Sequence, residues 1–125
     1  MTQDADFAEC QHCLGLAART EAQRLTRMFD EHLRPFDITI NQFTMLVTLV
    51  LAGPQPVTRL AGRLGIDRTT LTRNVARAER RGLVRKRPGE DSREHLIEIT
   101  PAGREHAAQA LPAWKAAQQE AQARD

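Results

Sequence analysis

Residues 67–82 read DRTTLTRNVARAERRG, and this stretch decides the fold. Asp67 can accept hydrogen bonds from the free amides of a following helical turn, and Gly82 can adopt the left-handed conformation that ends a helix. Between them, Leu71, Val75 and Ala78 recur at helical spacing, which predicts one buried face. The sequence therefore predicts a single capped helix.

The other face of this predicted helix carries short hydroxyl groups and guanidinium groups, with no large apolar side chain. A backbone bearing such side chains can approach DNA closely, because hydroxyls reach phosphates or base edges and arginine forks match guanine. The composition therefore predicts a face that enters a major groove. Its members are Thr69, Thr72, Arg73, Ala76, Arg77 and Arg80.

A short apolar-periodic run, Val57 to Ile66, precedes this helix and contains Gly65 near its end. It predicts a short helix followed by a tight turn, with Thr58 as the capping residue. A short helix, a glycine turn and a second helix with a polar face are typical of a helix-turn-helix. We therefore expect a helix-turn-helix over residues 57–82.

Two strand-like runs follow, at Leu83–Lys86 and His95–Ile99. The loop between them, residues 87–94, is charged and contains Pro88 and Gly89, which are turn residues. A hairpin directly after a helix-turn-helix predicts a winged helix. We call residues 83–99 the wing.

Three motifs in this half of the chain carry a family resemblance. They are Asp67–Arg73, Glu79–Val84, and Asp91-Ser92-Arg93 leading to Ile97–Gly103. With them the segment resembles the MarR family of bacterial transcriptional regulators. The third is similar to the family's wing signature, an aspartate and an arginine ahead of a strand that ends in Leu-Thr and then Gly; here Ile99 replaces the usual leucine.

The resemblance implies a mainly α fold with a small β-hairpin wing, in which the first and last helices of two subunits interlock. The implied function is that of a homodimeric DNA-binding repressor, released by a small-molecule or oxidant signal. The expected organisation is one domain, 1–125, with dimerisation helices at 1–34 and 101–125 and a DNA-binding lobe at 39–100. The candidate dimer residues are Leu14, Leu25, Phe29, Leu111 and Trp114.

Apolar periodicity predicts one first helix from about Phe7 to Leu33, ended by Pro35. Thr39 or Asn41 is expected to cap the next helix, which ends near Gly53.

The last helix is expected to begin with Thr100 as its cap and Pro101 as its first residue. Pro112 predicts a kink or break after about Ala108, because proline lacks an amide hydrogen and clashes with the preceding turn. The second piece should turn back onto the first helix, place Trp114 in the dimer region, and fray after Glu120.

The expected DNA contacts lie on the helix-turn-helix and the wing. Arg93 suits the narrow minor groove, and Asp91 would orient an arginine through a carboxylate fork. The alternative for the charged wing is a solvated hairpin tip. Arg85, Lys86 and Arg87 suit phosphates. The candidate contacts are Thr58, Arg68, Thr69, Thr70, Thr72, Arg73, Arg77, Arg87 and Arg93.

Charge is distributed unevenly along the chain. Residues 57–94 hold eleven Arg or Lys and five Asp or Glu, a net charge of +6, whereas the remaining residues hold seven and eleven, a net of −4. A basic centre between acidic ends predicts a polyanion partner. The helix-turn-helix makes double-stranded DNA the expected polyanion, and the expected two-fold dimer predicts a pseudo-palindromic site. No apolar run has membrane-spanning length, and the N-terminus lacks the basic start of a secretion signal, so we expect a cytoplasmic protein.

Cys10 and Cys13 form a C-x-x-C spacing with three readings. They can be two small apolar residues on one helical face, a thiol-based redox sensor, or half of a zinc site; the third lacks further ligands at a recognised spacing. We expect no metal, no cofactor and no enzyme activity, because the histidines are scattered and no triad spacing or phosphate-binding glycine loop occurs. The remaining alternatives are a winged helix that binds protein without binding DNA, and Trp114 as the lining of an effector crevice.

Overall fold

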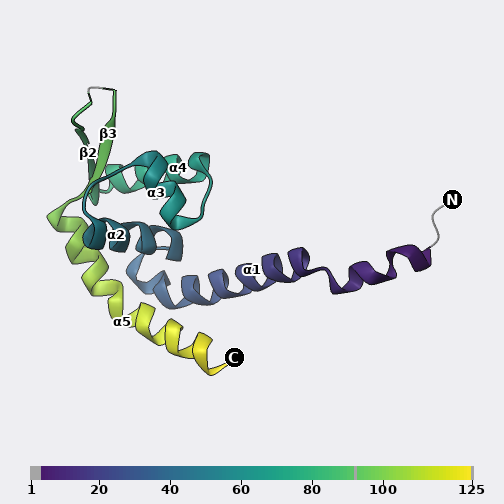
Figure 1. Cartoon of the computed structure of the whole chain (residues 1–125). Helices are drawn as coiled ribbons and strands as arrows, with labels where there is room; N and C mark the ends of the chain where they lie inside the picture. The colour runs from purple at the N-terminus through teal and green to yellow at the C-terminus, as the bar shows by residue number, and fades with distance from the viewer. Residues whose placement is uncertain (1–3, 92, 125) are drawn as a thin grey trace.

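A small lobe and two longer helices that extend from it make up the computed structural model, which describes residues 4–91 and 93–124 (Figure 1). The mainly α winged-helix fold is confirmed. Predicted boundaries that fall on residues 1–3, 92 and 125 lie outside the described residues. In chain order the elements are η1 (Asp4–His12, a 3-10 helix), α1 (Leu14–Leu33), η2 (Arg34–Phe36, a 3-10 turn), α2 (Ile40–Ala52), β1 (Gln55–Pro56), α3 (Val57–Leu64), α4 (Arg68–Arg80), β2 (Val84–Pro88), β3 (His95–Ile99) and α5 (Pro101–Ala123).

Helices α3 and α4 form the expected helix-turn-helix. The carboxylate of Asp67 caps α4, accepting the Thr70 backbone N–H at 2.8 Å, and Gly82 adopts a φ of 75° just after the helix ends. Leu71, Val75 and Ala78 are all buried, as their spacing predicted. The assigned start of α4 and its buried face therefore follow directly from the sequence pattern.

Thr58 is not the cap of α3, contrary to the expectation. The helix begins at Val57, two residues earlier than a cap at Thr58 implies, and Pro56 occupies the capping position with no side-chain hydrogen bond. A proline there sets an extended backbone and has no amide hydrogen to satisfy. Thr58 is an exposed residue in the first turn, which leaves its hydroxyl available for other partners.

The wing is part of a three-stranded antiparallel sheet with the order β1-β3-β2. The predicted hairpin is confirmed, with Val84 opposite Ile99 and Pro88 opposite His95. Strand β2 ends at Pro88, two residues past its expected end at Lys86. The two-residue strand β1 was not predicted; its Gln55 pairs with Ile97. This third strand attaches the wing to the entrance of α3.

The single first helix expected from Phe7 to Leu33 is wrong. The chain forms a 3-10 helix up to His12 and then restarts as α1, with Cys13 at the capping position and its Sγ accepting the Leu16 N–H at 3.4 Å. The backbone of Cys13 is extended, with φ −66° and ψ 113°, and this conformation interrupts the helical chain between the two segments. The predicted end of this helix ahead of Pro35 is confirmed.

Helix α2 begins with the capping box of Thr39 and Gln42, which fixes the corner between α1 and the lobe. The core is centred on this helix. The fully buried large side chains are Leu33, Met45, Leu46, Leu49, Leu60, Leu71 and Ile97.

None of the described helices is on its own both long and apolar enough to cross a bilayer. Only the pair Asp6–Phe36 and Ile40–Ala52, bent by 77°, reaches that length and composition jointly.

Helix α5 runs unbroken through Pro112, so of the kink or break that was expected, the break into two helical pieces is wrong. Figure 1 shows that its ribbon curves instead of dividing into two pieces. Pro112 is exposed, whereas Ala110 and Ala117, before and after it, are buried. Packing on both sides of the proline therefore holds one helix together despite the missing hydrogen bond.

The expected fraying after Glu120 is also wrong, because α5 continues to Ala123. Glu120 faces His32 of α1 at 3.3 Å and Arg124 at 3.9 Å. The contact with His32 holds the end of α5 beside α1, whereas the contact with Arg124 lies within the last turn of α5 itself.

Candidate nucleic-acid interface

The outward face of α4 is exposed, but its hydroxyl groups differ in what they leave available. Thr70 donates its hydroxyl hydrogen to the Asp67 carboxylate at 2.8 Å, and Thr72 donates to the Arg68 carbonyl at 2.8 Å. Thr69 is exposed and forms no side-chain hydrogen bond within the described residues. Thr69 can therefore donate to a phosphate or a base, whereas Thr70 and Thr72 present acceptor lone pairs.

Asp67 holds the start of this face in place. Its pKa lies below its usual value because the Thr70 backbone N–H, and then the Thr70 hydroxyl, donate to the ionised carboxylate. The negative charge also sits at the positive end of the α4 dipole. Asp67 is thus a fixed anion at the N-terminus of the helix, engaged by its own chain.

The predicted arginines fall into two places. Arg68 and Arg73 are exposed near the start of α4 and form no ion pair within the described residues. Arg77 lies nearer the C-terminus of the helix, where it lines a hollow of about 360 Å³ with Asp30 and Arg81. The structure therefore separates Arg77 from the arginines that lie next to the cap.

The entrance of α3, the start of α4 and the wing meet at a second hollow, of about 740 Å³. Four residues that the sequence analysis singled out come together here, although the first and last are 35 positions apart in the chain: Thr58, Arg68, Asp91 and Arg93. The hollow is open and mixed in charge, with three arginines on its walls. Its lining residues are Pro56, Val57, Thr58, Arg59, Arg68, Asp91, Arg93, Glu94 and His95.

Asp91 does not form the carboxylate fork expected for it within the described residues. Its Oδ1 instead accepts the backbone N–H of Arg93 at 3.0 Å. Aspartate commonly bonds to the backbone two residues on, since that N–H is within reach in a turn. Asp91 thus shapes the turn before Arg93 and leaves the Arg93 guanidinium exposed.

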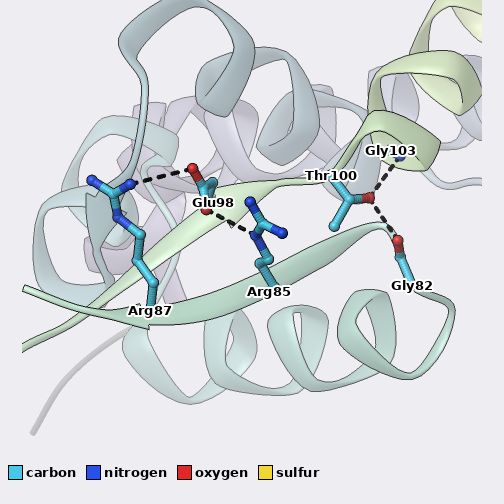
Figure 2. Close-up of polar contacts among 6 residues, drawn as sticks. All are labelled: Gly82, Arg85, Arg87, Glu98, Thr100 and Gly103. Atoms are coloured by element: carbon cyan, nitrogen blue, oxygen red, sulfur yellow. Dashed lines mark hydrogen bonds and ion pairs between the residues drawn. The ribbon is translucent and has the colours of Figure 1, made fainter.

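Glu98 is a wing residue that the sequence reasoning missed. Its carboxylate accepts hydrogen bonds from Nε of Arg85 at 2.9 Å and from Nη1 of Arg87 at 3.5 Å (Figure 2). Arg85 lies directly opposite Glu98 in the hairpin, and Lys86 lies opposite the buried Ile97. Because neighbouring residues in a strand face opposite ways, Lys86, which is exposed, lies on the same side of the hairpin as Ile97, while the two arginines share the other side. The cross-strand register was the signal that could have found Glu98.

The thiols of Cys10 and Cys13 are free and exposed. Cys13 sits at the first turn of α1, where its sulfur accepts a backbone N–H. Within the described residues, no three His, Cys, Asp or Glu side chains gather where they could hold a metal ion. Neither side chain is buried within its own chain, so any apolar packing of the two residues would require a second copy.

The candidate dimer residues differ in exposure. Leu14 is 84% exposed and Leu111 38%, whereas Leu25 and Phe29 are half-buried. Trp114 is half-buried and stacks on Phe43 of α2, with ring centroids 6.4 Å apart and 20° between the planes. Trp114 therefore packs on the core of its own lobe, while the second half of α5 lies against α1 as expected, with Glu120 beside His32.

Comparison with known proteins assigns this arrangement to a family. Residues 38–95 match the MarR family model. A crystal structure of the M. tuberculosis transcriptional regulator MosR in complex with DNA has a TM-score of 0.81 and 38% identity, covering 90% of this chain and 82% of that chain. The chain belongs to the MarR family. A MarR variant from E. coli complexed with operator DNA has a TM-score of 0.80 and 29% identity, covering 91% of this chain and 82% of that one.

Curated relatives match a shorter part of the chain. An uncharacterised HTH-type transcriptional regulator of Bacillus subtilis, YwoH, is 33% identical over 79 residues, which is 63% of this chain and 58% of the relative. The E. coli multiple antibiotic resistance protein MarR is 32% identical over 91 residues, which is 72% of this chain and 63% of the relative. The aligned chain thus spans about three fifths of the length of these curated relatives.

Proposed function

We propose that this protein is a sequence-specific DNA-binding transcriptional regulator that acts as a homodimer in the cytoplasm, as a repressor. The observation that carries the proposal is the exposed hydroxyl and arginine face of α4, next to a hollow that joins Thr58, Arg68 and Arg93. The DNA complexes of MosR and of the E. coli MarR variant support it, since both proteins share this fold. The proposal includes no catalytic step and no cofactor.

In the proposed complex, α4 enters a major groove from its N-terminal end, where Thr69 and Arg73 form no side-chain hydrogen bond or ion pair with the rest of the described chain. Arg73 carries a planar fork of donors that matches O6 and N7 of guanine. Arg93, held at the turn that Asp91 shapes, enters the neighbouring minor groove, whose narrow floor attracts arginine. Arg68 and the exposed hydroxyl of Thr58 contact the backbone between these two sites. Two such sets related by a two-fold axis would bind a pseudo-palindrome.

Affinity selection from a pool of random DNA duplexes tests the proposal. We expect selection of a pseudo-palindromic site and a steep loss of affinity as salt rises, because phosphate contacts release counterions. Equal affinity for selected and random duplexes would contradict sequence-specific binding. Binding to protein with little salt dependence, and none to DNA, would favour the protein-interaction alternative.

A thiol-based sensor is a second candidate function, and one observation favours it. The sulfur of Cys13 accepts the Leu16 N–H at the N-terminus of α1, where backbone amides interact favourably with negative charge. Peroxide would oxidise one thiolate to a sulfenic acid and release hydroxide; the second thiol would then displace water and form a Cys10–Cys13 disulfide. The exposure of both sulfurs gives an oxidant access.

The sensor is tested by measuring DNA affinity before and after peroxide treatment. We expect the treated protein to lose two free thiols and bind its selected site more weakly, with recovery after reduction by dithiothreitol. Cys13→Ser should bind DNA normally and respond to peroxide weakly. An unchanged affinity of the fully oxidised protein would reject the sensor and leave DNA binding intact.

A small-molecule effector is the other release signal that we propose. An apolar hollow of about 270 Å³ lies between α2 and α5, with Arg104 as its one charged wall. Its lining suits an aromatic ring with a carboxylate facing the guanidinium. Benzoate at millimolar concentration is therefore expected to release DNA from the wild type, and Val47→Trp, which fills the hollow, should remove the response. DNA binding that is insensitive to benzoate in both proteins would refute this site for that class of ligand.

A further inference from the structure

One hydroxyl group connects the end of α4 to the beginning of α5. Thr100 caps α5 with φ −91° and ψ 165°, and its Oγ1 accepts the Gly103 N–H at 3.0 Å. The same Oγ1 donates its hydrogen to the Gly82 carbonyl at 2.6 Å (Figure 2). Because the hydroxyl acts as acceptor and donor at once, its hydrogen bonds fix two elements relative to each other. We call the contacts among Gly82, Leu83, Thr100 and Gly103 the α4–α5 joint.

The main chain tightens the same joint. The Thr100 N–H donates to the Leu83 carbonyl at 3.1 Å. Gly82 and Leu83 are in turn bonded back to the last turn of α4, through Gly82 N–H to the Glu79 carbonyl at 3.0 Å and Leu83 N–H to the Ala78 carbonyl at 2.9 Å. The two carbonyls that Thr100 contacts therefore move with α4.

Gly103 removes the remaining space in the joint. A Cβ built on this buried glycine would lie 2.1 Å from the Leu83 carbonyl oxygen and 2.7 Å from Ile99 Cγ1. Such a contact is far shorter than any tolerated between non-bonded atoms, so the backbone of α5 lies directly against the chain that leaves α4. The joint has no side-chain layer that could shift to absorb a rotation.

We propose that Thr100 is a positioning residue that sets the angle between the recognition helix α4 and the dimerisation helix α5. This inference rests on the proposed function, because in a dimer that angle sets the distance between the two recognition helices. A helix the length of α5, 23 residues, spans about 35 Å, so a rotation of about 5° at the joint moves its far end by about 3 Å. The rise of one base pair is close to that displacement, about 3.4 Å. The joint therefore determines the half-site spacing that the dimer prefers.

Two substitutions separate this role from simple helix capping. Thr100→Val is nearly isosteric and removes both hydrogen bonds of the hydroxyl. Thr100→Asp keeps an acceptor for the Gly103 N–H but has no hydrogen to donate to the Gly82 carbonyl when ionised. Thr100→Ser keeps both bonds. Thr39→Val is the matched control, since Thr39 caps α2 with nearly the same backbone angles, φ −94° and ψ 165°, and bonds only within its own capping box.

The measurement is the dissociation constant on the selected DNA site and on copies with one base pair added or removed between the half-sites. The wild type should bind the unchanged spacing at least tenfold more tightly than either copy. Thr100→Val and Thr100→Asp should reduce that ratio at least threefold, whereas Thr100→Ser and Thr39→Val should keep it. Thermal unfolding of Thr100→Val and Thr39→Val reports whether the two lose similar stability.

Two results overturn the inference. An unchanged spacing ratio in Thr100→Val and Thr100→Asp would show that the hydroxyl only stabilises α5. A ratio reduced equally in Thr39→Val would show that any lost cap has the same effect. If the wild type binds no DNA site specifically, the proposed function itself fails. If the wild type binds a site specifically and the Thr100 variants keep its spacing ratio, only the positioning role of Thr100 fails.

Discussion

At the scale of single residues, the hydroxyls of α4 show why exposure alone does not define a DNA contact. Thr69, Thr70 and Thr72 all lie on the predicted face, yet only Thr69 keeps its hydrogen free within the described residues. A threonine that bonds the carbonyl four residues earlier has already used its donor. Thr69 is therefore the hydroxyl that we expect to donate to a phosphate oxygen.

Arg73 carries the first prediction. Arg73→Ala should weaken binding to the selected site by about 1–3 kcal/mol and relax the preference at one base pair, because a bidentate contact with guanine is lost. Competition binding with single-base variants of the site measures both effects. Arg19→Ala, which alters an exposed arginine on α1, is the control and should change neither. An equal loss on random DNA would instead identify Arg73 as a phosphate contact.

Asp67 carries a prediction about pH. Its pKa is lowered in the folded state, so the ionised cap stabilises the fold above the pKa of the unfolded chain, about 4, and this contribution is lost as the pH falls through the folded value. Asp67→Asn should therefore show a smaller loss of melting temperature than the wild type between about pH 5 and pH 2. Thermal melts across that range measure the difference. Identical pH profiles would show that the carboxylate charge does not stabilise α4.

Residue-level features were predictable from sequence where the partner is a near neighbour in the chain. The cap at Asp67 and the left-handed Gly82 depend on a few adjacent residues, and both were predicted. The role of Glu98 was not predicted, because its arginine partners lie on another strand and the strand register decides which side chains lie opposite each other. The Asp91 carboxylate was expected to bind an arginine side chain, but it accepts the nearby backbone N–H of Arg93 instead.

At the scale of elements, Pro112 in α5 makes the third prediction. The helix continues through it, so the backbone lacks one hydrogen bond where alanine would form it. Pro112→Ala should raise the free energy of unfolding by up to about 3 kcal/mol, the cost of an interior proline, and reduce the curvature of the helix. Urea unfolding measures the change. A stability equal to that of the wild type would mean that the bend relieves the strain completely.

Helices with clear caps were predictable, and short or interrupted elements were not. Thr39, Asp67 and Thr100 each mark the start of a helix, because their side chains satisfy free amides that every helix start presents. Strand β1 has two residues, too few to show any periodicity, and exists only because β3 lies beside it. Continuity of α5 through Pro112 likewise depends on packing that sequence spacing does not reveal.

At the scale of the whole molecule, α1 and η1 extend away from the lobe (Figure 1). Phe7, Leu14 and Leu16 on this segment are 59%, 84% and 48% exposed. A single chain gains little from presenting such side chains to water, so we expect a second copy to cover them. The family resemblance implied that these helices are a dimer region, but sequence periodicity could not show where the first helix breaks.

Assembly gives the fourth prediction. The wild type should sediment as a dimer at micromolar concentration, and Leu14→Glu should shift it toward monomer, because a charge replaces an apolar group in the contact. Its far-ultraviolet circular dichroism should stay unchanged, since Leu14 touches little in its own chain. Arg63→Glu, on exposed α3, is the control and should remain dimeric. A wild-type monomer would contradict the two-fold half-site model.

The three-stranded sheet has a consequence for behaviour at high local concentration. Its two edges are β1, two residues long and ending in Pro56, which has no N–H, and β2, which carries Arg85, Lys86 and Arg87. Exposed edge strands are the places where a second chain can add a strand and start aggregation, and proline, short length and positive charge each oppose this. Wings from neighbouring molecules crowded along one DNA duplex would therefore repel at one edge and find nothing to pair with at the other.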